Sequence, residues 1–95
     1  MKISYDYDNT LTEYKVQLLA KERIQKGDEV YIISARSRPG PLFKLGAELG
    51  IKRSNIFAVG SNLNKIKKVQ ELGIDLHFDD NSKVIELLGK VGRLV

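Results

Sequence analysis

Two aspartates one residue apart, Asp6 and Asp8, stand near the start of the chain in the stretch DYDNT. Ser34 follows a second apolar run, Lys65 a third, and the pair Asp79–Asp80 a fourth. Carboxylates that are packed closely raise each other's pKa values unless a cation joins them. Oxygen ligands of this kind suit Mg²⁺, which binds one or two carboxylates together with water and substrate phosphate. If the fold brings these residues together, we expect a site for a metal ion and a phosphate group.

The hydrophobic pattern predicts the elements that must position these residues, because its period alternates between that of a strand and that of a helix. We expect strands at 2–6, 29–34, 56–60 and 74–78, helices at 12–26, 41–49, 63–72 and 82–89, and a short fifth strand in the tail RLV. This alternation predicts an α/β fold: a doubly wound parallel sheet, with helices on both faces as outer layers and right-handed crossovers. Ligands of such sheets bind at the carboxyl ends of the strands, where the polar residues of this chain gather.

Length and composition exclude several classes of protein. With 95 residues, of which 42% are hydrophobic, we expect a single domain over residues 1–95. The absence of cysteine excludes disulfides, a thiolate nucleophile and a zinc–cysteine site. The net charge of +4 favours anionic partners, but the basic residues are scattered, so a nucleic-acid partner is not the main expectation.

The sequence also indicates where the protein works. No apolar run approaches the ~18 residues of a membrane span. The first expected strand begins at Lys2, which leaves no room for a signal or transit peptide. We therefore expect no membrane partner and a cytoplasmic location.

Four stretches of the chain together resemble the motifs of the haloacid dehalogenase (HAD) superfamily. DYDNTL is similar to the first motif, DxDxT, and YIISAR to the second, a strand that ends in Ser or Thr. Lys65 in NLNKIKK is similar to the third motif, a lysine that opens a helix, and HFDDN to the fourth, an acidic pair after a hydrophobic strand. The motifs occur in the family's order and span residues 3–81. The resemblance implies a Rossmann-like HAD fold.

The resemblance also implies a Mg²⁺-dependent phosphatase that acts on a small phosphorylated substrate. Asp6 would be the nucleophile that forms an aspartyl-phosphate, and Asp8 would be the general acid and base. Ser34 and Lys65 would bind the phosphoryl oxygens. Mg²⁺ would bind Asp6, the main-chain carbonyl of Asp8 and one acid of the fourth motif. The family's motif favours Asp80 for that role and leaves Asp79 as the alternative.

The chain departs from the family pattern in three respects. No acid follows the pair Asp79–Asp80 within three to five positions. Lys67 and Lys68 stand close enough to Lys65 to be alternatives for the motif lysine. No segment is long enough to form a cap, so we expect a capless, open site that suits a large substrate or is covered by a neighbouring subunit of a homo-oligomer.

Simpler structural interpretations apply to several of these residues. Thr10 with Glu13 three residues on has the pattern of a capping box, and one of residues 79–81 is expected to cap the last helix. His77, the single histidine, is expected to be a packed residue of its strand. Arg36 and Arg38 fit a solvated loop slightly better than a substrate contact.

Three other functions stay open. One is a receiver-type phospho-acceptor domain, although in that family the acidic pair precedes the acceptor aspartate. The second is a binding or regulatory module without turnover. A phosphatase that acts on nucleic-acid ends is a special case of the main hypothesis. A calcium loop is excluded, because Leu11 and Gln17 occupy the positions that need Gly and Glu.

Overall fold

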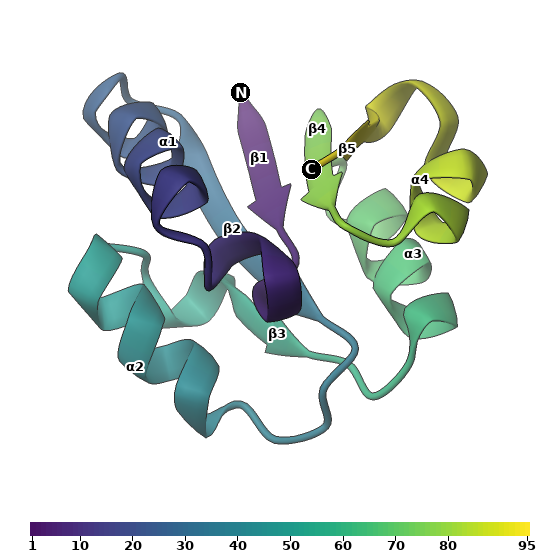
Figure 1. Ribbon diagram of the computed structural model, residues 1–95, viewed down its shortest axis with the longest axis horizontal. Coiled ribbons are helices and arrows are strands. Elements are labelled where there is room, and N and C mark those ends of the chain that lie inside the picture. The colour runs from purple at the N-terminus through teal and green to yellow at the C-terminus, as the bar shows by residue number, and fades with distance from the viewer.

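The computed structural model describes residues 1–95, and its centre is one sheet of five parallel strands (Figure 1). The strands are β1 (Lys2–Tyr5), β2 (Glu29–Ser34), β3 (Ile56–Ala58), β4 (Leu76–Asp79) and β5 (Gly92–Leu94). The α-helices are α1 (Tyr14–Gln25), α2 (Gly40–Leu49), α3 (Asn62–Glu71) and α4 (Ser82–Leu88), and 3-10 turns lie at Arg53–Asn55 and Gly89–Val91. The predicted α/β class and parallel sheet are confirmed, and the arrangement is Rossmann-like.

The strand order is β3-β2-β1-β4-β5, so β1 lies in the middle of the sheet. The chain first moves outward from β1 to β2 and β3, then returns to the other side of β1 and adds β4 and β5. The direction of winding therefore reverses between β1 and β4. In doubly wound sheets the crevice at the carboxyl ends of the two strands at such a reversal is the preferred ligand site.

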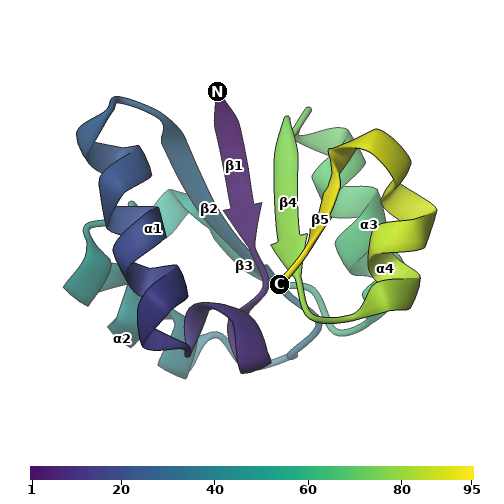
Figure 2. The same cartoon turned by 45° about the horizontal axis from the view of Figure 1, so that its top comes forward.

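Helices cover both faces of the sheet, and each face has its own core (Figure 2). On one face α1 and α2 pack on Ile3, Tyr5, Val30 and Ile32. On the other face α3 and α4 pack on Tyr31 and Ile33. Alternate residues of β1 and β2 thus point to opposite faces, as the period of a strand requires.

Two side-chain caps fix the starts of the helices that follow β3 and β4. The Ser61 hydroxyl accepts a hydrogen bond from the Asn64 N–H at the start of α3. The Asn81 side chain accepts hydrogen bonds from the N–H groups of Lys83 and Val84 at the start of α4. The prediction that one of residues 79–81 caps the last helix is confirmed.

The segment between β1 and α1 differs from the prediction. Helix α1 begins at Tyr14 instead of residue 12, and Tyr7–Leu11 forms a tight turn of its own. The Leu11 N–H donates to the carbonyl of Asp6, and this local bond holds the chain in the turn. The predicted capping box is wrong: Glu13 is the N-cap without a side-chain bond, and Thr10 is fully buried with an unpartnered hydroxyl.

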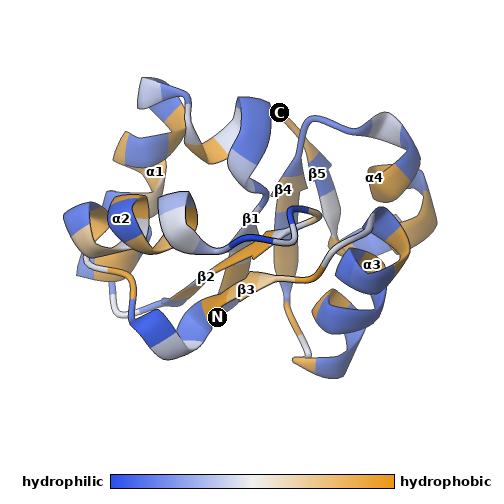
Figure 3. Cartoon of the chain, turned by 90° about the horizontal axis from the view of Figure 1, so that it is seen from below, coloured by the Kyte–Doolittle hydropathy of each residue, from blue (hydrophilic) through white to orange (hydrophobic).

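The hydropathy of the chain matches this arrangement. In Figure 3 the strands β2 and β3 are mainly hydrophobic, while the helices alternate between hydrophobic and hydrophilic residues. Each helix therefore buries one side against the sheet and leaves the other to water. No helix has both the length and the apolar character that a membrane crossing requires.

Candidate active site at the carboxyl ends of the strands

Strand alternation brings the acids of the first and fourth motifs to one face of the sheet. Ser4 on β1 and His77 on β4 are register partners in the parallel ladder. Asp6 and Asp79 follow two residues later, so each projects to the same face as the residue two positions before it. Helix α3 covers this face and supplies Lys65.

Lys65 joins the two acids directly. Its Nζ donates to Asp6 Oδ1 at 3.0 Å and to Asp79 Oδ2 at 2.9 Å. The three residues are no more than 5% exposed. Lys67 and Lys68 take no part: both line a separate hollow, and Lys68 pairs with Glu71 instead. Lys65 is therefore the lysine of α3 that reaches the acidic site.

The two buried acids differ in acidity. Burial raises the pKa of Asp6 to about 6, against the opposing effect of the Lys65 ammonium. Burial also disfavours ionisation of Asp79, but hydrogen bonds from His77, Lys65 and the Asn81 N–H outweigh it and hold the pKa of Asp79 at about 2. Near neutral pH Asp79 is thus firmly ionised, whereas the charge of Asp6 responds readily to its surroundings.

His77 and Ser4 extend the cluster and were not predicted as members of it. His77 is fully buried, with Nε2 at 2.9 Å from Asp79 Oδ2 and Nδ1 at 2.7 Å from Ser4 Oγ. Burial lowers the pKa of His77, so its ring is neutral near pH 7. A signal was present in the sequence: Ser4 and His77 each stand two positions before a site aspartate.

Asp8 lies at the same site but has a different partner. Arg36 holds both of its carboxylate oxygens, with Nε and Nη2 each at 2.8 Å. The hydrogen bond from Arg36 keeps the pKa of Asp8 below its ordinary value. The guanidinium also lies over the Tyr7 ring, 5.2 Å from its centroid. Arg36 is thus the counter-ion of Asp8 in this structure.

A pocket of about 180 Å³ opens onto this cluster. The sequence-predicted residues Asp6, Asp8, Ser34, Lys65, Asp79 and Asp80 all line it, together with Asn9, Ala35, Asn62 and Asn81. Asp6 and Asp8 approach the pocket from different elements. Asp6 directly follows the end of β1 at Tyr5, whereas Asp8 belongs to the turn Tyr7–Leu11. The Ser34 hydroxyl accepts a hydrogen bond from the Arg36 N–H at 3.1 Å and keeps its own proton for another acceptor.

The oxygen atoms of this pocket fit a hard cation. Asp6, Asp79 and Asp80 each offer a carboxylate oxygen, and these atoms lie within 4.8 Å of one another. When all three are ionised, the single ammonium of Lys65 leaves negative charge in excess. Asp79 already accepts three hydrogen bonds, whereas Asp80 is exposed. The role predicted for Asp8 concerns its main-chain carbonyl, and it stays a prediction.

Comparison with known proteins gives no further guide to this site. The chain matches no protein-family model, no curated protein and no solved structure.

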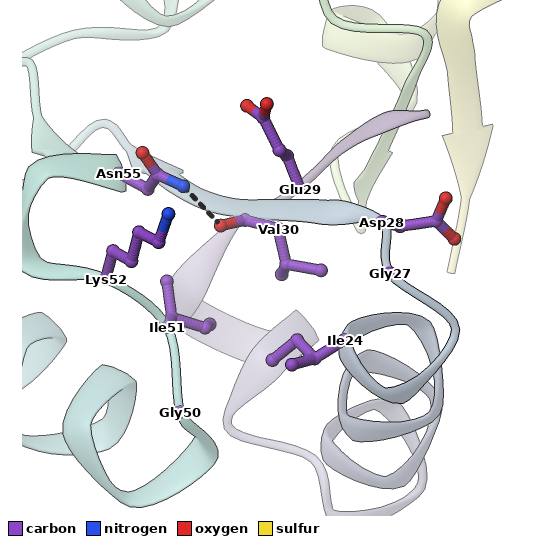
Figure 4. A pocket seen from close by; sticks show the side chains of 9 residues that line it. All are labelled: Ile24, Gly27, Asp28, Glu29, Val30, Gly50, Ile51, Lys52 and Asn55. Atoms are coloured by element: carbon purple, nitrogen blue, oxygen red, sulfur yellow. Dashed lines mark hydrogen bonds between the residues drawn. The ribbon is translucent and has the colours of Figure 1, made fainter.

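A second hollow, of about 190 Å³, lies at the amino end of β2 (Figure 4). Ile24, Val30 and Ile51 meet in its middle, and the carboxylates of Asp28 and Glu29 point away from it. The Asn55 amide is already engaged, since it donates to the Val30 carbonyl at 3.2 Å. No set of buried charges converges on this hollow, which sets it apart from the acidic pocket.

Proposed function

We propose that the protein is a Mg²⁺-dependent phosphomonoester hydrolase that works through an aspartyl-phosphate. It would be a capless member of the HAD superfamily with that family's three-layer fold. One observation carries the proposal: the buried Nζ of Lys65 bridges the buried acids Asp6 and Asp79 at the base of an open pocket, at the reversal point between β1 and β4. A nucleophilic carboxylate beside a fixed ammonium suits attack on a phosphoryl group, whose oxygens carry negative charge.

In the proposed reaction a carboxylate oxygen of Asp6 attacks phosphorus, and the bond from phosphorus to the leaving oxygen breaks. Asp8, once it has left Arg36 and has taken up a proton from water, gives that proton to the leaving oxygen and becomes ionised again. Asp8 then takes a proton from water, whose oxygen attacks the phosphorus and releases phosphate and free Asp6. Lys65 and Ser34 hold the phosphoryl oxygens throughout.

Asp8 can act only after it has parted from Arg36, because both of its oxygens accept hydrogen bonds from the guanidinium. The phosphate group of a substrate is an anion that competes for Arg36. Substrate binding would therefore free Asp8 for proton transfer. The sequence favoured a solvated loop for Arg36 slightly over a substrate contact. In this proposal Arg36 binds the substrate phosphate instead.

Asp6, Asp80 and the main-chain carbonyl of Asp8 would hold Mg²⁺, which would neutralise the acidic cluster and the charge of the phosphoryl oxygens. Asp79 would stay with Lys65, His77 and the Asn81 N–H. The all-oxygen ligand set and the excess of negative charge support this choice. The other parts of the proposal are a small phosphorylated substrate, no membrane partner, a cytoplasmic location and a homo-oligomer that covers the open site.

The test is release of phosphate from an aryl phosphate by the wild type, Asp6→Asn and Asp28→Asn, each with Mg²⁺ or EDTA. Asp28 is the matched control, because it is an aspartate at the opposite, amino end of the strands. We expect release that needs Mg²⁺, persists in Asp28→Asn and falls by at least about 1,000-fold in Asp6→Asn. Release that survives Asp6→Asn would overturn the assignment of the nucleophile.

A phospho-acceptor or binding domain without turnover is the second candidate. The ion pair that occupies both oxygens of Asp8 favours it, since such a domain needs no general base. Incubation with acetyl phosphate distinguishes the two functions. A stable covalent adduct on Asp6 without phosphate release would support the acceptor, Mg²⁺ binding without an adduct would support the binding module, and rapid phosphate release would support the hydrolase.

A further inference from the structure

A continuous chain of hydrogen bonds runs beneath the acidic pocket. It passes from Ser4 Oγ to His77, from His77 Nε2 to Asp79 Oδ2, and from Asp79 through Lys65 Nζ to Asp6 Oδ1. Each contact is between 2.7 and 3.0 Å long, and every residue is at most 5% exposed. Ser4 and His77 have no place in the proposed reaction, yet they are as deeply buried as the residues that do.

The direction of each bond follows from the donors available. An ionised carboxylate only accepts, so His77 Nε2 must carry the hydrogen that it donates to Asp79. The neutral ring then has its lone pair on Nδ1, and the Ser4 hydroxyl donates to it. Asp79 Oδ2 thus receives His77 on one side and Lys65 on the other. Donation therefore runs from Ser4 through His77 to Asp79, and Lys65 donates both to Asp79 and to Asp6.

We infer that Ser4 and His77 are positioning residues, which act through Asp79 to hold the Lys65 ammonium against Asp6. This inference rests on the proposed function, in which Lys65 and Asp6 take part in phosphoryl transfer. Packing alone does not call for the two residues, because an apolar pair at these register positions would join β1 to β4 without burying polar groups. Residues that orient metal ligands through one hydrogen bond typically contribute about 10- to 100-fold to activity, and we expect an effect of the same order here.

The test compares His77→Phe, His77→Gln and Ser4→Ala with the matched control Tyr31→Phe. Tyr31→Phe also removes one side-chain hydrogen bond, between Tyr31 and Glu29, away from the pocket. We expect kcat to fall by about 10- to 100-fold in His77→Phe and to less extent in Ser4→Ala, with KM nearly unchanged. His77→Gln should recover part of the loss, because its amide can donate to Asp79. Tyr31→Phe should retain the wild-type kcat.

Two nuclear magnetic resonance signals test the same inference without hydrolysis. In the ¹⁵N-labelled wild type the ring proton of His77 should lie on Nε2, and the Lys65 ammonium should exchange slowly with water. Ser4→Ala and His77→Gln should speed the exchange of the Lys65 ammonium, whereas Tyr31→Phe should not. If the wild type hydrolyses nothing, the proposed function fails, and these two signals still decide whether Ser4 and His77 position Lys65.

Three results would overturn the inference. One is a neutral His77 ring whose proton lies on Nδ1, since Nε2 could not then donate to Asp79. The second is unchanged Lys65 exchange in both Ser4→Ala and His77→Gln. The third is an unchanged kcat in a folded His77→Phe or, if that variant does not fold, in both Ser4→Ala and His77→Gln.

Discussion

The two ends of the sheet carry hollows of nearly equal size and opposite character. The pocket at the carboxyl ends, of about 180 Å³, contains buried acids that share one ammonium. The hollow at the amino end of β2, of about 190 Å³, has an apolar middle. Its aspartate, Asp28, turns outward and pairs with the N-terminal ammonium at 2.9 Å.

The two hollows differ in charge and burial, not in volume, and these two properties distinguish the end at which we propose the active site. Burying an acid costs free energy that a single ion pair seldom restores. At the amino end the charged groups stay near water and pair locally, which stabilises the fold. At the carboxyl end the chain keeps charged groups inside, and the proposed function gives a physical reason to do so.

Removal of the shared ammonium should have the largest effect on stability. Lys65→Met leaves Asp6 and Asp79 buried without their cation, so we expect the free energy of unfolding to fall by about 3–5 kcal/mol at neutral pH. Lys52→Met removes an exposed lysine beside the other hollow and should change it by less than about 0.5 kcal/mol. Urea denaturation of both variants measures the difference, and equal losses would contradict the comparison.

Asp6 and Asp28, at the two ends of the strands, should change the free energy of unfolding in opposite directions as the pH rises. Because the pKa of Asp6 rises from 3.8 to about 6 on folding, the folded state keeps a proton that the unfolded state has lost in this range. The contribution of Asp6 to the free energy of unfolding of the metal-free protein should therefore fall as the pH rises from about 4 to 6, by up to about 3 kcal/mol, and it equals the difference between the wild type and Asp6→Asn. Denaturation at a series of pH values measures this fall.

Asp6→Asn should remove the fall, and Asp28→Asn should leave it in place. Bonding to the N-terminal ammonium lowers the pKa of Asp28, so the stability that Asp28 contributes is present above pH 3.8 and is lost as the pH falls below it. A fall between pH 4 and 6 that persists in Asp6→Asn would show that another group carries it.

Mg²⁺ should stabilise the protein by binding only at the acidic pocket, at the carboxyl ends of the strands. At a concentration 100 times its Kd, Mg²⁺ should raise the free energy of unfolding by about 2.7 kcal/mol, because it binds only the folded state. Asp80→Asn should remove most of this gain, and Asp28→Asn should keep it. Thermal unfolding across a magnesium titration measures the gain, and equal responses of the two variants would argue against a site at Asp80.

The ion pair between Arg36 and Asp8 should contribute the least to stability. Both side chains are nearly half exposed, so Arg36→Met should change the free energy of unfolding by less than about 1 kcal/mol. Its effect should appear in the pH profile of hydrolysis instead. Without Arg36 the pKa of Asp8 rises, so the alkaline limb of kcat/KM should move to higher pH. Arg38→Met, on the same loop, should leave that limb unchanged.

Much of the fold could be predicted from sequence because each element has its own local period. The predicted strand at 29–34 has the same bounds as β2, because the apolar, β-branched run within EVYIIS marks the strand clearly. The turn at Tyr7–Leu11 was missed because Thr10 and Glu13 fit a capping box equally well. The choice between the two depends on main-chain hydrogen bonds that residue types do not determine.

Site residues such as Asp6 and Lys65 could be predicted because each has an ionisable side chain and follows an expected strand. The contribution of His77 depends on its place beside Ser4, 73 residues away, and strand pairing over that distance is absent from any local pattern. The bond between Arg36 and Asp8 likewise joins two loops through their side chains. Contacts between residues far apart in the sequence were therefore missed, whereas residues whose side-chain type suggests chemistry were found in the pocket.

The central place of β1 has a consequence for synthesis of the protein. Its pairing with β2 can form early, but its second partner, β4, begins only at Leu76. At ribosomal rates of about 5–20 residues per second, one edge of β1 waits roughly 4–15 seconds for that partner. During this interval an open strand edge is exposed to wrong pairing with other chains. Release of β4 from the ribosome closes that edge and brings Asp79 to Asp6, so protection from aggregation and assembly of the site come in the same late step.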